Sequence, residues 1–264
     1  MILDGRAIAQ DVYSRLLRTQ PRQKPVLGIV VGSHDKAIES FVHIKSRAAQ
    51  NLGVELRRID LPNQPTTADA IAAVEKLAPN VQGIIVQLPL PGSIDTEAVL
   101  KAIPPYLDVD AINPAVSEGK KLVLSPVAGA IEVILERYKI ETSGKNCVIV
   151  GAGRLVGAPA AELLKHLGGR LSVVSLEKGD ISEVRNADII VLGAGNPVFI
   201  KPEMIKEGVV LIDAGTSESS GKIVGDADPA CASKCSVFTP VPGGVGPIAV
   251  AMIFKNLYTL TKAQ

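Results

Sequence analysis

Short apolar runs alternate with amphipathic stretches along the first hundred residues of this 264-residue chain. Runs rich in Val, Ile and Leu predict buried strands at 25–31, 54–61 and 83–86. Apolar residues at helical spacing predict helices at 7–17, 37–51, 67–77 and 92–102. Gly53 should end the second helix, and Ser93 or Asp95 should cap the fourth. Such alternation is typical of a parallel, doubly wound α/β sheet.

The second half of the chain repeats the alternation after a helix at 128–138. Its strands are predicted at 147–150, 171–176, 187–192, 209–213 and 236–239. Its later helices are predicted at 155–167 and at 248–260, the last being strongly apolar. The length suits one large domain or two modest ones, each of the α/β class.

A glycine-rich turn joins the predicted strand at 147–150 to the next helix. Gly151, Gly153 and Gly157 let the backbone turn sharply and approach a ligand, and the helix N-terminus offers N–H groups to a phosphate. This is the arrangement of a dinucleotide site, although Val156 stands where the G-x-G-x-x-G pattern has its third glycine. Close packing also makes such turns glycine-rich, so the turn favours a nucleotide without requiring one.

Glu177 closes the strand after this helix, where a carboxylate accepts hydrogen bonds from the adenosine ribose. A carboxylate there also repels a 2′-phosphate, which favours NAD over NADP. Two nearby cations, Lys178 and Arg154, would instead pair with such a phosphate. A solvated charge at a strand end is the alternative explanation of Glu177.

Polar residues also follow strands in the first half. Gln87 stands where a buried strand meets the rigid loop 88–92 (LPLPG), at the edge where open α/β sheets bind ligands. A glutamine that only bonds the loop backbone is the alternative. Asp108 and Asp110 lie two positions apart in a segment read as extended, so both carboxylates should point to one side. A ligand or solvent would explain them better than a metal ion, because no further ligand has a matching spacing.

Composition narrows the functional classes. A net charge of +1 gives no basic field for nucleic acid, so a small-molecule partner is favoured. The three cysteines are explained as reduced thiols, since Cys231 and Cys235 lack a second pair that would complete a zinc site. No signal peptide or membrane-spanning run is evident, and a cytoplasmic location is expected.

Five segments match the motifs of one family in the right order. Residues 41–45 (FVHIK) resemble Y-V-x-x-K, and 86–91 (VQLPLP) match V-Q-L-P-L-P. Residues 108–110 (DVD) resemble the start of D-V-D-G, and 224–228 (VGDAD) resemble V-G-D-V-D. The loop 239–247 (TPVPGGVGP) is similar to the C-terminal signature. Over its whole length the chain thus resembles the bifunctional methylenetetrahydrofolate dehydrogenase/methenyltetrahydrofolate cyclohydrolase family.

The resemblance implies an α/β protein of two domains. Residues 1–115 would form a folate-binding domain that residues 245–264 complete with the C-terminal helix, and residues 116–244 would form a Rossmann-type dinucleotide-binding domain. It also implies a homodimer with two activities. One oxidises 5,10-methylenetetrahydrofolate with hydride transfer to NADP, the family default, or NAD. The other hydrolyses the methenyl product to 10-formyltetrahydrofolate.

The same motifs imply the site residues. Lys45 is expected to assist proton transfer during water attack, which requires a lowered pKa, and Gln87 to orient it. Asp110 is expected to accept hydrogen bonds from the pterin. The other expected residues bind substrate (Phe41, Pro242, Gly243 and Gly244) or dinucleotide (Gly151, Gly153, Arg154, Gly157, Glu177, Lys178 and Gly195).

The chain departs from the family pattern at several of these places. Phe41 replaces the tyrosine, Ala111 the glycine of D-V-D-G, and Ala249 the threonine of the G-P-M-T end. Ala152 and Gly153 replace the arginine and serine of the family's glycine turn, which again favours NAD. A member that has lost one activity, or a non-catalytic binding homologue, is the alternative, and the retained Lys45, Gln87 and Asp110 argue against the second of these.

Overall fold

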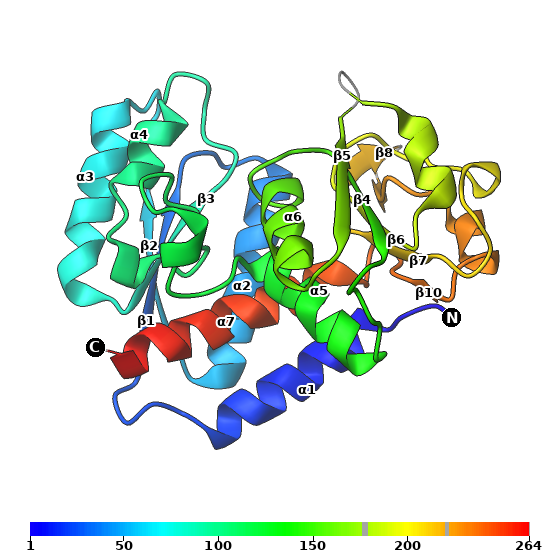
Figure 1. Cartoon of the computed structure of the whole chain (residues 1–264). Coiled ribbons are helices and arrows are strands. Elements are labelled where there is room, and N and C mark those ends of the chain that lie inside the picture. The colour runs from blue at the N-terminus through cyan, green and yellow to red at the C-terminus, as the bar shows by residue number, and fades with distance from the viewer. Residues whose placement is uncertain (176–178, 220–221, 264) are drawn as a thin grey trace. The chain divides into compact units, whose positions relative to one another are not determined.

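The computed structural model describes residues 1–175, 179–219 and 222–263, and the chain divides into two compact units. One, here called the Lys45 unit, comprises residues 11–126 and 250–264. The other, the Gly151 unit, comprises residues 1–10 and 127–249. Each contains one parallel sheet with helices, which confirms the predicted α/β class (Figure 1).

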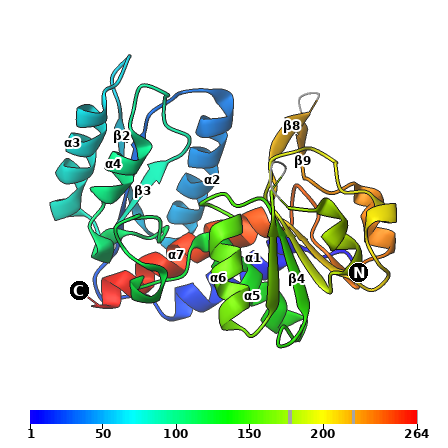
Figure 2. The same ribbon diagram turned by 45° about the horizontal axis from the view of Figure 1, so that its top comes forward.

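The Lys45 unit is built on a three-stranded parallel sheet in the order β2-β1-β3. Its strands are β1 (Val26–Val31), β2 (Glu55–Asp60) and β3 (Gly83–Gln87). Helix α2 (Lys36–Leu52) covers one face, whereas α3 (Thr67–Leu77) and α4 (Thr96–Lys101) cover the other (Figures 1 and 2). Short 3-10 turns lie at Ala78–Asn80, Pro105–Leu107 and Glu118–Lys120. Strand β1 is almost wholly buried because it is the central strand and has helices on both faces.

Helix α4 begins later than the sequence pattern predicts. The side chain of Asp95, not that of Ser93, caps it by accepting a hydrogen bond of 3.1 Å from the backbone N–H of Ala98. Ser93 donates its hydroxyl to the carbonyl of Pro65 instead, 3.0 Å away. The residues after Pro91 therefore tie one loop to another before the helix starts.

The Gly151 unit is built on a five-stranded parallel sheet in the order β10-β7-β6-β4-β5. Its strands are β4 (Asn146–Val150), β5 (Arg170–Val174), β6 (Ile189–Leu192), β7 (Val210–Asp213) and β10 (Val237–Phe238). Its helices are α5 (Pro126–Arg137), whose first residue belongs to the Lys45 unit, and α6 (Gly157–His166), with 3-10 turns at Ile181–Asn186, Pro202–Met204 and Pro229–Ser233. The antiparallel hairpin β8 (Ser217–Ser219) and β9 (Lys222–Val224) was not predicted, because its short strands lack a hydrophobic pattern.

The first residues of the chain extend the sheet of the Gly151 unit. Ile2 forms a parallel bridge with Phe238, and the N–H of Leu3 donates to the carbonyl of Phe238 at 2.9 Å. The N–H of Phe238 donates in turn to the carbonyl of Met1. Residues 1–10 thus pack with the second half of the chain, which differs from the predicted 1–115 domain.

Besides α5, the helices α1 (Gly5–Arg18) and α7 (Val245–Ala263) run through the unit boundaries. Within the Lys45 unit, Asn256 on α7 donates from its amide to the carbonyls of Val109 (2.8 Å) and Leu124 (2.7 Å). A Cβ on Gly83 of β3 would lie 2.8 Å from a methyl of Leu257, so α7 packs tightly on this sheet. None of the helices in the described ranges is long and apolar enough to cross a membrane.

The C-terminus of α5 carries a lysine in a conformation that favours glycine. Lys139 has a φ of +52°, and its N–H donates to Glu136 while that of Ile140 donates to Leu135. The same pair of bonds ends α2, where Gly53 occupies the position with a φ of +67°. A side chain in this left-handed region costs free energy that glycine avoids.

We therefore expect Lys139→Gly to raise the free energy of unfolding by about 0.5–1 kcal/mol, since Lys139 is exposed and its side chain has little packing to lose. Denaturant unfolding of the purified protein measures this. The reverse exchange, Gly53→Ala, should lower stability by a similar amount. An unchanged or lower stability of Lys139→Gly would contradict the argument.

Candidate active site

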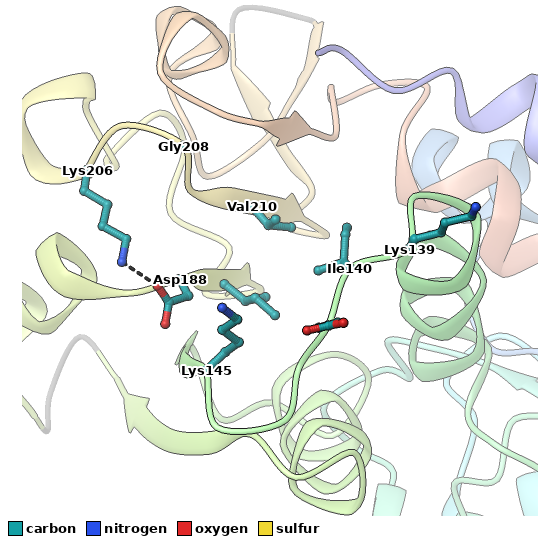
Figure 3. A pocket seen from close by; sticks show the side chains of 9 residues that line it. Lys139, Ile140, Lys145, Asp188, Lys206, Gly208 and Val210 are labelled. Atoms are coloured by element: carbon teal, nitrogen blue, oxygen red, sulfur yellow. Dashed lines mark hydrogen bonds and ion pairs between the residues drawn. The ribbon is translucent and has the colours of Figure 1, made fainter.

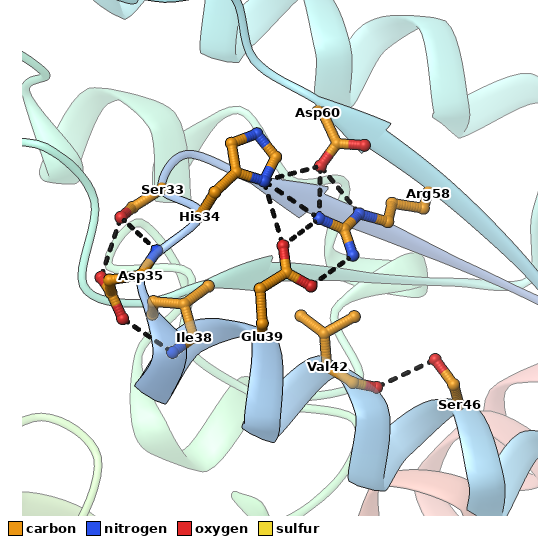
Figure 4. Close-up of polar contacts among 9 residues, drawn as sticks. All are labelled: Ser33, His34, Asp35, Ile38, Glu39, Val42, Ser46, Arg58 and Asp60. Atoms are coloured by element: carbon orange, nitrogen blue, oxygen red, sulfur yellow. Dashed lines mark hydrogen bonds and ion pairs between the residues drawn. The ribbon is translucent and has the colours of Figure 1, made fainter.

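The N-terminus of α2 is fixed to β2 by a cluster of charged side chains (Figure 4). Arg58 on β2 donates to both carboxylate oxygens of Glu39, at 2.5 and 2.9 Å, and to Asp60 at 2.7 Å. His34 adds a contact of 3.0 Å to Glu39. Hydrogen bonds from Arg58 and His34 lower the pKa of Glu39 to about 2. The helix that carries Phe41 and Lys45 is thereby held at its first turn, which Asp35 also caps.

Lys45 and Gln87 meet where β1 and β3 of the Lys45 unit end. The ammonium of Lys45 donates to the side-chain oxygen of Gln87 at 2.8 Å. The amide nitrogen of Gln87 donates to the carbonyl of Leu88, also at 2.8 Å, which turns its oxygen toward the lysine. Strands β1 and β3 are neighbours at the point where the strand order reverses, a usual place for ligands in such sheets. Gln87 thus bonds both the loop and the lysine, and its contact with a ligand stays a prediction.

Asp110 lies in a turn and not, as predicted, in an extended segment. Asp108 pairs with Ile84 of β3, and its carboxylate then accepts the N–H groups of Ile112 and Asn113, both at 2.8 Å. Ala111 has a φ of +51°, which explains why glycine suits this position. Asp108 is therefore a buried structural group that shapes the turn, while the side chain of Asp110 interacts with Lys45.

Lys45 and Asp110 are electrostatically coupled. Burial lowers the pKa of Lys45, and the attraction of Asp110 offsets part of that shift. Burial raises the pKa of Asp110 to about 7; the charge of Lys45 opposes this shift, and that of Asp108 adds to it. Both pKa values are thus shifted toward neutral pH, where an amine or a carboxyl can exchange protons with a bound molecule.

Phe41 lies one helical turn before Lys45, and the lysine nitrogen is 6.0 Å from the centre of its ring. That distance is at the outer limit of a cation–π interaction. The ring is exposed over about a third of its surface, at 36%. It therefore offers an apolar face beside the lysine and no hydroxyl.

In the Gly151 unit, the glycine turn lies where the strand order reverses between β4 and β6. Gly151 has a φ of +98°, and a Cβ on Gly157 would lie 1.8 Å from the carbonyl oxygen of Gly151. A Cβ on Gly193, after β6, would clash with Val156 at 2.3 Å. These three glycines are required by close backbone packing, so the packing explanation of the turn is correct for them.

The tip of the turn is different. Ala152, Gly153 and Arg154 are exposed, and a Cβ on Gly153 would meet nothing within 4 Å. No side chain caps α6, whose first residue is Gly157. Free space beside a helix N-terminus suits a phosphate, so the turn fits a dinucleotide as well as its own packing. Gly195 lies on the neighbouring loop with a φ of +65°. The expected cofactor residues Glu177 and Lys178 lie outside the described residues.

The proline-glycine loop 239–247 uses much of its backbone within the Gly151 unit. The N–H of Gly244 donates to Pro240 at 2.7 Å, and the carbonyl of Gly243 accepts from Gly5 at 2.9 Å. A Cβ on Gly5 would lie 1.8 Å from the oxygen of Gly244. The loop is therefore held against the start of α1, and Pro242 on this loop is exposed.

A polar cavity of about 350 Å³ lies at the opposite end of the same sheet (Figure 3). It is bordered by the starts of β4, β6 and β7, with Lys139, Lys145 and Lys206 around it. Lys206 is already paired with Asp188 at 2.6 Å and bonds the carbonyl of Asn186. Since the glycine turn is at the other strand ends, this cavity is separate from the candidate dinucleotide site.

The described part of the chain contains no group of three residues suited to hold a metal ion. Cys147, Cys231 and Cys235 are free and buried, and burial raises the pKa of each thiol, to about 11, 11 and 12. None is a reactive thiolate at neutral pH.

Sequence reasoning missed two residues of the Gly151 unit. The side chains of Asp213 and Asp226 are almost inaccessible to solvent, although carboxylates are usually exposed. Asp213 ends a predicted strand and Asp226 lies in the VGDAD motif, so the motif was recognised without a role. Two glycines near them in the sequence, Gly215 and Gly225, could have indicated these buried carboxylates, because a side chain at either position would occupy the space of a carboxylate.

Comparison with known proteins gives a consistent result over the whole chain. Residues 3–110 match the family model for the tetrahydrofolate dehydrogenase/cyclohydrolase catalytic domain. Residues 125–264 match that for the tetrahydrofolate dehydrogenase/cyclohydrolase NAD(P)-binding domain.

Individual proteins agree with the family models. The bifunctional protein FolD of Halothermothrix orenii is 37% identical over 271 residues, 97% of this chain and 95% of that protein. The bifunctional FolD methylenetetrahydrofolate dehydrogenase/cyclohydrolase of Campylobacter jejuni is similar in structure with a TM-score of 0.92, at 32% identity, and 100% and 99% of the two chains are covered. A Trypanosoma brucei methylenetetrahydrofolate dehydrogenase-cyclohydrolase complexed with NADP and an inhibitor gives 0.93 at 31% identity, covering 100% and 97%.

The raised pKa of Asp110 makes stability depend on pH. The folded chain holds this proton more tightly than the unfolded chain, so the contribution of Asp110 becomes less favourable as pH rises from about 4 to about 7. Asp110→Asn should therefore equal the unaltered protein near pH 4 and be more stable by about 1–2 kcal/mol above pH 7.

Denaturant unfolding at a series of pH values measures this difference. Glu75→Gln, on the exposed side of α3 in the same unit, controls for the loss of one negative charge. A constant difference between Asp110→Asn and the unaltered protein across this range would show that Asp110 ionises normally.

Proposed function

This chain belongs to the tetrahydrofolate dehydrogenase/cyclohydrolase family, and on that premise we propose that it interconverts one-carbon derivatives of tetrahydrofolate. It oxidises 5,10-methylenetetrahydrofolate to the methenyl form with NAD or NADP, and hydrolyses that product to 10-formyltetrahydrofolate. The observation that carries the proposal is the Lys45–Gln87 hydrogen bond beside Asp110, at the reversal point of a sheet in a chain with the family's motifs.

The dehydrogenase reaction needs a dinucleotide, whose nicotinamide ring accepts the hydride. The glycine turn fits its phosphates, because Gly153 faces open space while Gly151 and Gly157 keep the strand and helix close. Arg154 and Gly195 would complete the binding loops. Lys45 and Asp110 would bind and orient the folate, the hydride donor.

The cyclohydrolase reaction needs a base for water. A water molecule adds to the methenyl carbon, and one of its protons passes to the amine of Lys45. The bond from this carbon to N5 then breaks as N5 takes up a proton and the new hydroxyl loses its own, which leaves the formyl group on N10 and releases one proton overall. The lowered pKa of Lys45 raises the fraction of free amine, and Gln87 fixes the nitrogen by accepting one of its hydrogens. Asp110 would accept hydrogen bonds from the pterin amino and ring N–H groups.

The family default for the cofactor is NADP, and we propose that this chain uses NAD at least as well. Ala152 stands where the family has an arginine that pairs with the 2′-phosphate, and a carboxylate at Glu177 would repel that phosphate. Ala152 is exposed at the tip of the turn, so its replacement changes the cofactor surface without disturbing the packing.

A homodimer and a cytoplasmic location complete the proposal. The first rests on the family resemblance alone. The second is supported by three free buried cysteines, which suit a reducing compartment.

The test of the function is a pair of assays on one preparation. Purified protein should oxidise methylenetetrahydrofolate with NAD at a kcat/KM equal to or above that with NADP, and should accelerate decay of methenyltetrahydrofolate absorbance. Lys45→Met, which keeps most of the side-chain volume, should lower the hydrolysis rate about 100-fold or more.

Lys36→Met, an exposed lysine on the same helix, is the matched control and should keep both rates. If the protein oxidised methylenetetrahydrofolate neither with NAD nor with NADP, the dehydrogenase assignment would be contradicted. Equal hydrolysis by Lys45→Met and the unaltered protein would remove Lys45 from the mechanism.

Phe41 motivates a second test. Without the family's hydroxyl beside Lys45, we expect the cyclohydrolase activity to be weaker relative to hydride transfer. Phe41→Tyr should raise the hydrolysis rate by about tenfold or less while changing the dehydrogenase kcat less than twofold, because the ring packs in the same exposed position. Parallel kinetics of the two reactions measure the ratio, and a hydrolysis rate unchanged by the new hydroxyl would refute this explanation.

A further inference from the structure

Asp213 and Asp226 form a buried carboxylate pair at the ends of β6 and β7 in the Gly151 unit. Their exposed fractions are 1% and 0%. Burial and their mutual repulsion raise the pKa of Asp213 to about 6, and burial also raises that of Asp226. Buried charges of like sign are costly, so their presence needs an explanation beyond packing.

Asp226 holds the loop that follows β6. One of its carboxylate oxygens accepts the N–H groups of Ala194, at 2.7 Å, and Gly195, at 3.2 Å. Its other oxygen is buried and finds no hydrogen-bond partner among the described residues. Gly195 is among the expected dinucleotide residues; it is exposed and has a φ of +65°. Asp226 therefore fixes the conformation of a candidate cofactor loop from below.

Asp213 holds two further loops. Its carboxylate accepts the N–H groups of Gly215, at 2.9 Å, and Ala227, at 2.8 Å. Its own N–H donates to the hydroxyl of Thr239 at 2.6 Å, and that hydroxyl is 3.2 Å from the carbonyl of Asp213. Thr239 begins the proline-glycine loop. The pair thus links the loops after β6 and β7 with the loop after β10.

The glycines around the pair show how closely it is enclosed. A Cβ on Gly215 would lie 2.3–2.5 Å from the carboxylate of Asp226. A Cβ on Gly225 would lie 2.2 Å from an oxygen of Asp213. The backbones of both glycines thus pack directly against the carboxylates, where no side chain would fit, and each carboxylate accepts backbone N–H groups of the loops above it.

We propose that Asp226, together with Asp213, is a positioning residue for the dinucleotide: it sets the loop at Ala194 and Gly195 in the conformation that binds the cofactor. The proposal rests on the proposed function. Neither carboxylate need touch the cofactor, because both are buried beneath the loops they hold. What the loop requires of residue 226 is an oxygen that accepts the N–H groups of Ala194 and Gly195, and a negative charge at this position is not required.

The test compares Asp226→Ala with Asp226→Asn. The alanine variant removes the acceptor and should weaken binding of NADH and NADPH about tenfold, with a similar rise in the KM for the oxidised cofactor. The asparagine variant keeps an oxygen at the same place and should bind within about twofold of the unaltered protein. Hydrolysis of methenyltetrahydrofolate uses no dinucleotide and should stay within about twofold in both.

Two further variants guard against a general loss of structure. Asp228→Asn changes the neighbouring carboxylate, which caps a 3-10 turn and pairs with Lys201, and should leave dinucleotide binding unchanged. Thr239→Val removes only the hydroxyl of the network and should weaken binding less than Asp226→Ala. If Asp226→Ala fails to fold, Asp226→Ser, which draws the acceptor oxygen back from Ala194 and Gly195, replaces it, and an affinity equal to that of the unaltered protein would overturn the proposal.

The outcomes separate the two hypotheses. Equal affinity of Asp226→Ala and the unaltered protein would overturn the positioning role alone. Equal weakening by Asn and Ala would also overturn it, since that result would assign the effect to charge. Absence of dinucleotide binding by the unaltered protein would contradict the proposed dehydrogenase itself, and the positioning role would fall with it.

Discussion

A buried amine needs an oxygen to receive its hydrogens, and the Lys45 unit is arranged around that requirement. Gln87 provides the oxygen because β3 ends beside β1 and its amide is turned by the carbonyl of Leu88. The lysine is in reach because α2 is fixed at its first turn by Arg58 and Glu39. The sheet order, the loop and the helix terminus therefore all contribute to a single hydrogen bond. Asp110, which is electrostatically coupled to Lys45, lies in a turn that the buried carboxylate of Asp108 shapes.

The two units use the same topological device for different chemistry. In each, three neighbouring parallel strands are ordered so that the first lies between the second and the third: β2-β1-β3 and β5-β4-β6. The reversal point receives polar side chains, Lys45 and Gln87, in one unit and bare backbone, Gly151 and Gly193, in the other. Side chains suit proton transfer, whereas backbone N–H groups suit phosphates. The sheet order fixes where each site lies, and the residue types fix what it does.

The sequence predicted the elements well where local signals are strong. Helix α3 has the predicted bounds, 67–77, and Gly53 ends α2 as expected. Motifs identified Lys45, Gln87 and Asp110, and the first two prove to be bonded. The predicted extended segment around Asp108 was wrong, because its carboxylate folds back on later N–H groups that periodicity does not reveal. Asp213 and Asp226 were missed for a related reason, since their partners come from three distant loops.

The glycine turn also bears on how such a protein diverges. Gly151 and Gly157 pack so closely that neither position can accept a side chain, whereas Ala152, Gly153 and Arg154 are exposed, and a Cβ on Gly153 would meet no described atom within 4 Å. Selection for folding and selection for cofactor choice therefore act on different residues of one seven-residue segment. Substitutions at the exposed tip can change the surface offered to a dinucleotide while the strand, the tight turn and the helix are inherited intact.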